Sequence, residues 1–351
     1  MSARAFVVAG RTIAPGRPAF VIAEAGVNHN GDPALARKLI DAAADSAADA
    51  VKFQTFRTAA LTSRTAPKAA YQIESTGAAE SQSEMLSRLE LSADVLRSLQ
   101  AHAEARRIVF FSTPFDEASA DTLATLGVPL FKIPSGEITN LPLLRHVVAK
   151  GKPIILSTGM STLDEVADAL AAVREVADVP VAILHCVSAY PAPVGEVNLK
   201  AMDTLRERFG YPVGLSDHTL GLEIPIAAVA RGAVIVEKHL TLDKRLPGPD
   251  HRASLEPGEM AALVGGIRNV EAALGDGAKR PMPSELDTRR VARKSLVAAR
   301  PIRAGEELVK DAVAIKRPGT GVSPAELERA LGRRVRRDLA ADDVIDWTVL
   351  E

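Results

Sequence analysis

The sequence predicts an α/β protein whose main part is a (β/α)8 (TIM) barrel, followed by a small β-rich domain. From about residue 19 to 275, short β-branched runs alternate with longer amphipathic segments, which is typical of βα units around a parallel sheet. The alternation contains eight such units, and eight units suit a closed barrel. A Gly/Pro-rich stretch then ends the pattern.

The expected strands are nearly continuous in apolar residues, as strands buried on both faces should be. They are Ala19–Ala25, Ala50–Thr55, Ile108–Thr113, Leu130–Pro134, Pro153–Thr158, Val181–Val187, Pro212–Ser216 and Ala233–Lys238. Several of the helices expected between them open with Asp or Pro. Clear examples are Pro33–Ala47, Asp116–Leu126, Leu163–Ala177 and Pro257–Leu274. A doubly wound open sheet would also alternate, but the chain has no GxGxxG or Walker loop.

A polar insertion, Arg57–Leu91, interrupts the pattern between the second strand and a helix expected at Ala93–Ala105. Insertions of this length are usually functional lids or disordered segments. Since the loop following a barrel strand lies on the catalytic face, the position favours a lid.

The second interruption is the Gly/Pro-rich stretch Gly275–Pro283. We therefore expect a barrel domain over residues 1–275, a linker over 276–286 and a small domain over 287–351. The small domain has 14 Lys+Arg against 11 Asp+Glu, too small an excess to indicate nucleic acid. Two of its stretches, Arg300–Leu308 and Arg337–Ile345, resemble each other as an apolar strand followed by a tight turn, which predicts a pseudo-symmetric β-rich module.

Composition excludes several classes of protein. The 351 residues balance 43 Lys+Arg against 44 Asp+Glu, which excludes a basic nucleic-acid-binding protein and an acidic tail. The single cysteine, Cys186, excludes an internal disulfide and a cysteine metal cluster, and a buried small hydrophobe is its expected state. The N-terminal apolar run Phe6–Ala9 is too short for a signal-peptide core, and no stretch approaches the roughly 20 apolar residues of a membrane span. We expect a cytoplasmic protein with no membrane or nucleic-acid partner.

Polar side chains gather at the ends of the expected strands, where barrel enzymes place their chemistry. Lys52 and Lys132 come from separate strands, and the hydroxyls nearby are those of Thr113, Ser135, Ser157 and Ser216. Ammonium groups supply charge for a phosphate, and hydroxyls supply directional donors. Each lysine has two alternative readings, a salt bridge at the barrel rim or a Schiff-base nucleophile activated by burial. The combination of groups favours a phosphate site.

Five of the seven histidines lie at or just beyond expected strand ends: His29, His185, His218, His239 and His251. His218 and His239 follow adjacent strands, so their imidazoles would meet above the barrel and could bind a divalent cation with water and a carboxylate. Glu24 and Asp217 are the carboxylates nearby. Asp217 has an alternative role, which is to orient His218 through a hydrogen bond.

With these motifs the chain resembles the sialic acid synthase family, which includes N-acetylneuraminate, legionaminate and pseudaminate synthases. The matching segments are Ala23–Gly31, Val51–Gln54, Ser112–Phe115, Lys132–Glu137, Leu156–Met160, Gly214–Thr219, Glu237–His239 and Pro247–His251. The C-terminal module, with Lys316–Gly321, resembles the antifreeze-like (SAF) domain of these enzymes. The resemblance covers nearly the whole chain.

The resemblance implies condensation of phosphoenolpyruvate with an open-chain N-acetylated amino sugar, which gives a nine-carbon 3-deoxy-2-keto acid and phosphate. It implies Mn²⁺ or Mg²⁺ on His218 and His239, polarising the sugar aldehyde. Phosphoenolpyruvate would be held by Lys52, Thr113, Lys132, Ser135, Ser157, Ser188 and Ser216. Glu137 would assist proton transfer when water adds to the oxocarbenium carbon.

Other family positions near the sugar and the metal are matched by Glu24 and Asp250 as catalytic candidates and by Gln54 and Tyr190 as binding candidates. In the family, the SAF domain of one subunit caps the partner's barrel, and an arginine there contacts the N-acyl group of the sugar. Arg317 matches it, which implies a domain-swapped homodimer. The alternative for Arg317 is that it is only a surface cation. The alternative for the C-terminal domain is that it only stabilises the protein.

The main prediction is an N-acetylneuraminate synthase acting on N-acetylmannosamine, and the alternative is a legionaminate synthase acting on 2,4-diacetamido-2,4,6-trideoxymannose. Asn28–Gly31 and Val51–Phe56 resemble these two branches more than the pseudaminate branch. Some N-acetylneuraminate synthases have Asn where Ser188 stands. From a different class, a Schiff-base aldolase would use Lys132 or Lys52. A non-enzymatic carbohydrate-binding protein with a relic barrel would be expected to lose polar groups at the strand ends, but this chain keeps them. A related synthase acting on a sugar phosphate would need a second phosphate site, and the sequence resolves none.

Overall fold

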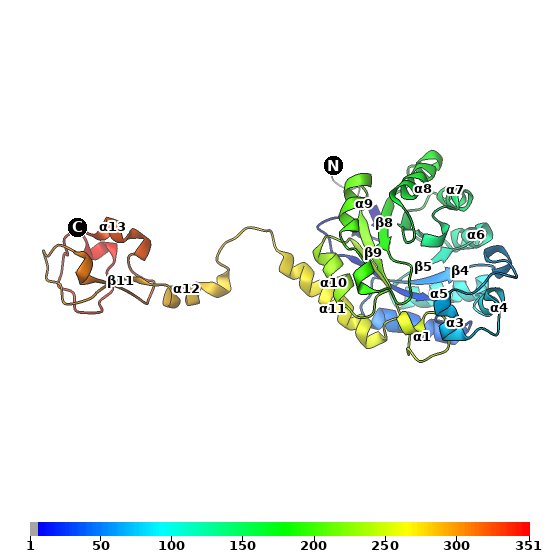
Figure 1. Ribbon diagram of the computed structural model, residues 1–351, viewed down its shortest axis with the longest axis horizontal. Coiled ribbons are helices and arrows are strands. Elements are labelled where there is room, and N and C mark those ends of the chain that lie inside the picture. Colours follow the sequence, from blue (N-terminus) through cyan, green and yellow to red (C-terminus); the bar gives the residue numbers. More distant parts are fainter. Residues whose placement is uncertain (1–5) are drawn as a thin grey trace. The chain divides into compact units, whose positions relative to one another are not determined.

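The computed structural model of the protein describes residues 6–351. The chain divides into two compact units, Met1–Gly275 and Asp276–Glu351 (Figure 1). None of the helices in the described part of the chain is long and apolar enough to cross a membrane.

Eight parallel strands form the barrel of the first unit. They are β3 (Phe20–Gly26), β4 (Ala50–Thr55), β5 (Val109–Pro114), β6 (Phe131–Ile133), β7 (Ile154–Ser157), β8 (Val181–Cys186), β9 (Val213–Asp217) and β10 (Ile235–His239). Their order is β5-β4-β3-β10-β9-β8-β7-β6, so the first and last barrel strands pair, with Phe20 opposite Ile235. The remaining seam lies between β5 and β6, which pack against each other without forming a ladder. The predicted (β/α)8 barrel is confirmed, with strand bounds within two residues of those expected.

The helices surround the strands (Figure 1). They are α1 (Pro33–Asp45), α5 (Ala93–Ala105), α6 (Glu117–Leu126), α7 (Leu141–Val148), α8 (Leu163–Val176), α9 (Ala201–Phe209), α10 (Glu223–Ala230) and α11 (Pro257–Leu274). Their starts have the predicted chemistry, since Asp32 accepts a hydrogen bond from the Ala34 amide and Asp116 from the Ser119 amide.

The barrel core is aliphatic. Every residue of β3 is buried, and each Val, Leu or Ile side chain removed from water stabilises the fold by roughly 1.5–3 kcal/mol. Ahead of β3, the antiparallel pair β1 (Phe6–Val8) and β2 (Arg11–Ile13) includes the apolar run that the sequence marked as too short for a signal core. Asp49 is buried, accepts from the Val21 amide at 2.8 Å and pairs with Arg11 and Arg268. This contact ties β2, β3 and α11 together.

The insertion at 57–91 is folded, so its disordered alternative is wrong. It contains three short helices, α2 (Thr58–Leu61), α3 (Ala70–Thr76) and α4 (Gln82–Ser87). Ser81 and Glu84 form a capping box at the start of α4. Leu61, Leu86 and Leu89 pack on side chains that follow the strands, which attaches the insertion to the rim of the barrel.

The second unit has its own apolar core. It contains η4 (Pro283–Glu285), α12 (Leu286–Ala292), the antiparallel pair β11 (Ser295–Ala298) and β12 (Val313–Lys316), and α13 (Leu327–Ala330). The two similar stretches meet here, because the amide and carbonyl of Ile302 bond reciprocally to those of Leu339 at 2.9 and 2.8 Å. The ring centre of Trp347 lies 4.6 Å from the guanidinium of Arg329 and 5.4 Å from that of Arg333.

Candidate active site

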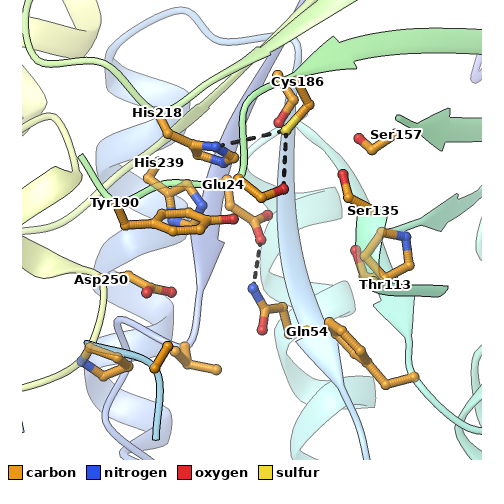
Figure 2. Close-up of a pocket in the computed structure, with 18 of the residues that line it drawn as sticks. Glu24, Gln54, Thr113, Ser135, Ser157, Cys186, Tyr190, His218, His239 and Asp250 are labelled. Carbon is orange, nitrogen blue, oxygen red and sulfur yellow. Dashed lines mark hydrogen bonds between the residues drawn. The ribbon is translucent and has the colours of Figure 1, made fainter. Parts of the chain in front are cut away.

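A cavity of about 470 Å³ opens at the carboxyl ends of the barrel strands. Of the residues that the sequence marked as site candidates, thirteen line it (Figure 2). They are Glu24, Lys52, Gln54, Thr113, Lys132, Ser135, Ser157, Ser188, Tyr190, Ser216, His218, His239 and Asp250. Alternation along a strand explains pairs such as Lys52 and Gln54, which share the inward face of β4.

Two candidates do not line the cavity. Glu137 lies in the 3₁₀ turn Ser135–Glu137, where its carboxylate accepts from the Asn140 side-chain amide at 2.7 Å. The geometry therefore gives no support to its predicted proton transfer. Arg317 belongs to the second unit, is exposed, and donates from Nε to the carbonyl of Ala292 at 3.1 Å. Its contact with a substrate stays a prediction.

The floor of the cavity is a buried network of two lysines and two carboxylates. Lys132 Nζ donates to both oxygens of Glu237, at 2.8 and 3.0 Å. Lys52 Nζ lies 3.1 Å from Glu24 Oε2 and 3.6 Å from Glu237 Oε1, and donates to Thr113 Oγ1 at 2.9 Å. Each lysine has a carboxylate partner. The attraction between these opposite charges offsets part of the free energy that removing two ammonium groups from water costs. Glu237 lies in the matching segment Glu237–His239, but the sequence predicted no function for it.

Burial and charge divide the pKa values of this network. Burial raises the pKa of Glu24 to about 7, although Lys52 opposes it. Burial would also raise the pKa of Glu237, but Lys132 and Lys52 outweigh it and lower the pKa to about 2. Burial disfavours the charged form of Lys52, but the nearby Glu237 and Glu24 outweigh burial and raise its pKa. For Lys132, burial outweighs the attraction of Glu237 and lowers the pKa. One carboxylate is thus fixed as an anion, and the other can exchange a proton near neutral pH.

Above this network, His218 and His239 face each other with ring centres 5.4 Å apart. Tyr190 lies against His218, with ring centres 4.1 Å apart (Figure 2). His218 Nδ1 is 2.8 Å from the carbonyl of Val187 and must donate to it, so Nε2 is an acceptor when the ring is neutral. Burial opposes a charged His218, but Cys186 and the Val187 carbonyl raise its pKa. His239 Nδ1 is buried without a hydrogen-bond partner among residues 6–351. Burial lowers the pKa of His239 well below its usual value, so the ring is neutral, as a metal ligand must be.

The histidine pair therefore offers imidazole nitrogens suited to a cation. Within the described range, residues 6–351, no three His, Cys, Asp or Glu side chains are grouped as a metal site. A bound cation would take its remaining ligands from water and substrate.

Asp217 does not contact His218, contrary to the alternative role considered for it. Its carboxylate accepts from Lys238 Nζ at 2.5 Å and from Thr219 Oγ1 at 3.0 Å. Asp217 and Lys238 point to the opposite face of β9 and β10 from the two histidines, because side chains alternate along a strand. This buried ion pair joins the strands that carry the histidines. Cys186 is buried as expected, with Sγ 3.8 Å from His218 Nδ1.

Asp250 has a pH-dependent effect on stability that can be tested. Burial raises the pKa of Asp250 to about 6, with some opposition from His218. Below about pH 4 Asp250 is neutral in both the folded and the unfolded protein. As the pH rises from there through its folded-state pKa, the carboxylate ionises more easily in the unfolded chain, so the folded protein loses stability. In metal-free protein, Asp250→Asn should therefore become more stable than wild type as the pH rises from about 4 to 7, by about 3 kcal/mol at the upper end. Urea unfolding across this range measures it, and a difference that does not vary with pH would contradict the assignment.

Comparison with known proteins decides the family. Residues 39–279 match the NeuB family, and residues 293–351 match the SAF domain. The chain belongs to the NeuB family. The predicted resemblance, including the SAF domain, is confirmed, and the family's members include synthases of sialic, legionaminic and pseudaminic acids.

Two relatives of this NeuB-family chain are named N,N'-diacetyllegionaminic acid synthase. The protein from Legionella pneumophila is 48% identical over 337 residues, which are 95% of this chain and 94% of the relative. The protein from Campylobacter jejuni is 48% identical over 331 residues, 93% of this chain and 98% of the relative. The crystal structure of N-acetylneuraminic acid synthetase from Leptospira borgpetersenii matches with a TM-score of 0.72 at 35% identity, covering 82% of this chain and 95% of that one. The two legionaminic acid synthases are more similar to this chain in sequence than the N-acetylneuraminic acid synthetase, and they favour the alternative prediction over the main one.

Proposed function

We propose that this NeuB-family protein condenses phosphoenolpyruvate with 2,4-diacetamido-2,4,6-trideoxymannose, giving N,N'-diacetyllegionaminate and phosphate. Identity of 48% over nearly the full length of two synthases of that name carries the choice of sugar. The buried lysine and hydroxyl groups of the cavity support phosphoenolpyruvate as the other substrate. N-acetylmannosamine, the sugar of the main prediction, is the second candidate.

Phosphoenolpyruvate carries a phosphate and a carboxylate, and the floor of the cavity holds groups of the complementary kind. Lys52 and Lys132 provide buried charge, and Ser135, Ser157 and Ser188, which lie on or just after β6, β7 and β8, provide hydroxyls. Ser157 Oγ is buried and lacks a hydrogen-bond partner in the described part of the chain, so a ligand oxygen would satisfy it. Glu237 would then hold both ammonium groups in place while the substrate shares them.

His218 and His239 are the residues that would hold a divalent cation, Mn²⁺ or Mg²⁺. When bound, it would supply Lewis-acid polarisation of the sugar aldehyde. The ring of Tyr190 packs against that of His218, with centres 4.1 Å apart and planes tilted by 42°. Glu24 is a better candidate than Glu137 to move a proton when water adds, because it lines the cavity and its raised pKa of about 7 lets it both hold and release a proton.

The test is phosphate release from phosphoenolpyruvate with each of the two sugars, with and without Mn²⁺, alongside the product mass. We expect release that depends on the metal and is faster with the diacetamido sugar. Preference for N-acetylmannosamine would return the assignment to N-acetylneuraminate synthase. Absence of release with both sugars, together with borohydride trapping of a keto acid on Lys132 or Lys52, would favour the Schiff-base aldolase.

We also propose the domain-swapped homodimer implied by the resemblance. Large apolar side chains are exposed on segments that follow barrel strands, as expected of a face that a second subunit covers. They are Ile73, Met160, Leu163, Val194 and Leu220, and Met160 is 72% exposed.

Co-expression of two inactive variants tests this arrangement. Arg317→Ala leaves the barrel intact, and Lys132→Met leaves the SAF domain intact. If each site combines the barrel of one subunit with the SAF domain of its partner, each mixed dimer should regain one of its two sites, which is about a quarter of all sites when the two variants pair at random. Separately purified proteins that are mixed without subunit exchange are the control. No recovery in verified mixed dimers would contradict the swap.

A further inference from the structure

The cavity is divided into a charged part and an uncharged part. Its charged side chains come from the barrel strands and the loops after them. The insertion contributes seven side chains that carry no charge, here called the insertion wall: Leu61, Ala69, Tyr71, Gln72, Gln82, Met85 and Leu86. The insertion also holds Lys68, Glu80 and Arg88, but these bond to one another and do not line the cavity.

The apolar part of the insertion wall continues into the barrel rim. Leu61 and Leu86 pack with Val27, Phe56 and Phe115, which follow β3, β4 and β5. The rings of Phe56 and Phe115 meet edge to face, with centres 6.1 Å apart. One side of the cavity is therefore hydrocarbon, a surface that excludes an unpaired hydroxyl and accepts a methyl group.

The polar part of the insertion wall consists of two amides and a phenol. Gln72 Oε1 accepts from the Ala69 amide at 3.0 Å and from Gln82 Nε2 at 3.2 Å, and Gln82 Oε1 accepts from Thr62 at 3.0 Å. Tyr71 stacks on Tyr190 with ring centres 4.9 Å apart, and Tyr190 in turn lies on His218. The wall is thus connected to the histidine pair through two aromatic contacts.

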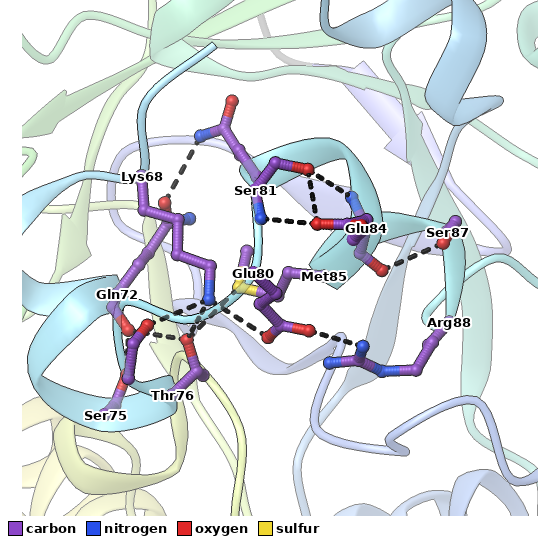
Figure 3. Close-up of polar contacts among 12 residues, drawn as sticks. Lys68, Gln72, Ser75, Thr76, Glu80, Ser81, Glu84, Met85, Ser87 and Arg88 are labelled. Atoms are coloured by element: carbon purple, nitrogen blue, oxygen red, sulfur yellow. Dashed lines mark hydrogen bonds and ion pairs between the residues drawn. The ribbon is translucent and has the colours of Figure 1, made fainter. Parts of the chain in front are cut away.

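A buried lysine holds this wall in shape. The Lys68 side chain is 2% exposed, and its ammonium group donates to Thr76 Oγ1 at 2.9 Å, to the Gly77 carbonyl at 3.1 Å and to Glu80 Oε1 at 3.0 Å (Figure 3). Thr76 Oγ1 donates in turn to the carbonyl of Gln72 at 2.7 Å. Lys68 therefore joins the end of α3, which carries Tyr71 and Gln72, to the segment that leads into α4, which carries Gln82, Met85 and Leu86.

We infer that the insertion wall selects a sugar in which acetamido and methyl groups replace hydroxyls, and that Lys68 is the residue that positions this wall. The inference rests on the proposed function and gives it a structural basis. The 2,4-diacetamido-2,4,6-trideoxy sugar has a terminal methyl and a second acetamido group where N-acetylmannosamine has hydroxyls. Its methyl groups suit Leu61, Met85 and Leu86, and its amides suit the two glutamines. The terminal hydroxyl of N-acetylmannosamine, in place of that methyl, would lose water against these apolar side chains without a partner.

The experiment compares kcat/KM for both sugars, and KM for phosphoenolpyruvate, in wild type, three test variants and one control variant. Leu86→Gln adds a polar group to the wall at a half-exposed position. Lys68→Met removes the positioning contacts, and Lys68→Arg retains the charge. Arg64→Met, at an exposed position of the same insertion, is the matched control.

Leu86→Gln should lower the preference for the diacetamido sugar about tenfold or more, the usual effect of one mismatched group in a pocket. Lys68→Met should raise KM for that sugar by a similar factor of about ten while KM for phosphoenolpyruvate changes less than about twofold, and Lys68→Arg should recover most of the loss. Arg64→Met should behave as wild type. A loss of fold would lower the apparent kcat for both sugars without changing KM, and it would appear in thermal unfolding. In that case Leu86→Gln decides the question alone.

The result for wild type tests the proposed function separately. If wild type prefers the diacetamido sugar but Leu86→Gln and Lys68→Met keep the same preference and the same KM, the inference is overturned and the proposed function stands. If wild type prefers N-acetylmannosamine, the proposed function is overturned, and the inference about which sugar the wall selects falls with it.

Discussion

Lys132→Met should lower the free energy of unfolding by about 3–5 kcal/mol and reduce kcat/KM by about 10²–10³-fold. The loss of stability arises because Glu237 is buried and would lose its bidentate partner, keeping only the Ser216 hydroxyl at 3.1 Å and the more distant cation of Lys52 at 3.6 Å. The loss of activity arises because one of two buried cations for phosphoenolpyruvate is removed. Urea unfolding and phosphate release measure the two effects on the same preparation.

A double variant separates these effects. Lys132→Met combined with Glu237→Gln removes both charges, so most of the stability should return while the activity should not. Lys38→Met, at an exposed position of α1, is the matched control and should change stability by less than about 0.5 kcal/mol. If Lys132→Met keeps wild-type activity, Lys132 does not bind the substrate. If the double variant is as unstable as the single one, the ion pair does not explain the destabilisation.

His218→Ala and His239→Ala should each weaken Mn²⁺ binding by at least about a hundredfold, because even the outer partners of metal ligands cost 10- to 100-fold when they are removed. The reason is geometric, since these rings face each other 5.4 Å apart and His239 Nδ1 has no other partner in the part of the chain that is described. Titration of the free-Mn²⁺ signal in electron paramagnetic resonance measures binding without any need for turnover.

His102→Gln is the control for the metal experiment. His102 lies on α5, where Nε2 is 2.9 Å from Asp41, away from the cavity. Its variant should bind Mn²⁺ as wild type does. Unchanged binding in both His218→Ala and His239→Ala would place the cation elsewhere and would contradict the assignment of the pair.

The barrel could be predicted because its signal is local. Runs such as Ala50–Thr55 are apolar on both faces, and the expected bounds of that strand are those of β4. The insertion could not be predicted in this detail. Its helices have four to seven residues and are too short to form by propensity alone, so they depend on contacts such as those of Lys68. The β1–β2 pair was missed for the same reason, since each strand has three residues.

The site was predictable where a residue ends a strand. Lys52 and Lys132 lie inside predicted strands, whereas Ser135 and His239 follow directly after them, and all four line the cavity. Glu137 follows the same rule in sequence, but a 3₁₀ turn intervenes and its carboxylate bonds to Asn140.

Glu237 was missed because its partner Lys132 is 105 residues away, although its inward position could have been read from its spacing of two residues from His239. Tyr71 and Gln72 line the cavity only because of how the insertion packs on the barrel. No periodicity in the sequence predicts that packing.

The position of Trp347, in contact with two guanidinium groups of the second unit, has a spectroscopic consequence. Trp347 is the only tryptophan in the sequence, and the three tyrosines, Tyr71, Tyr190 and Tyr211, all belong to the first unit. Selective excitation of the indole therefore follows the SAF domain alone, while far-ultraviolet circular dichroism is dominated by the barrel helices. Non-coincident denaturation curves from these two probes would show that the two units unfold independently, without the need to cut the chain.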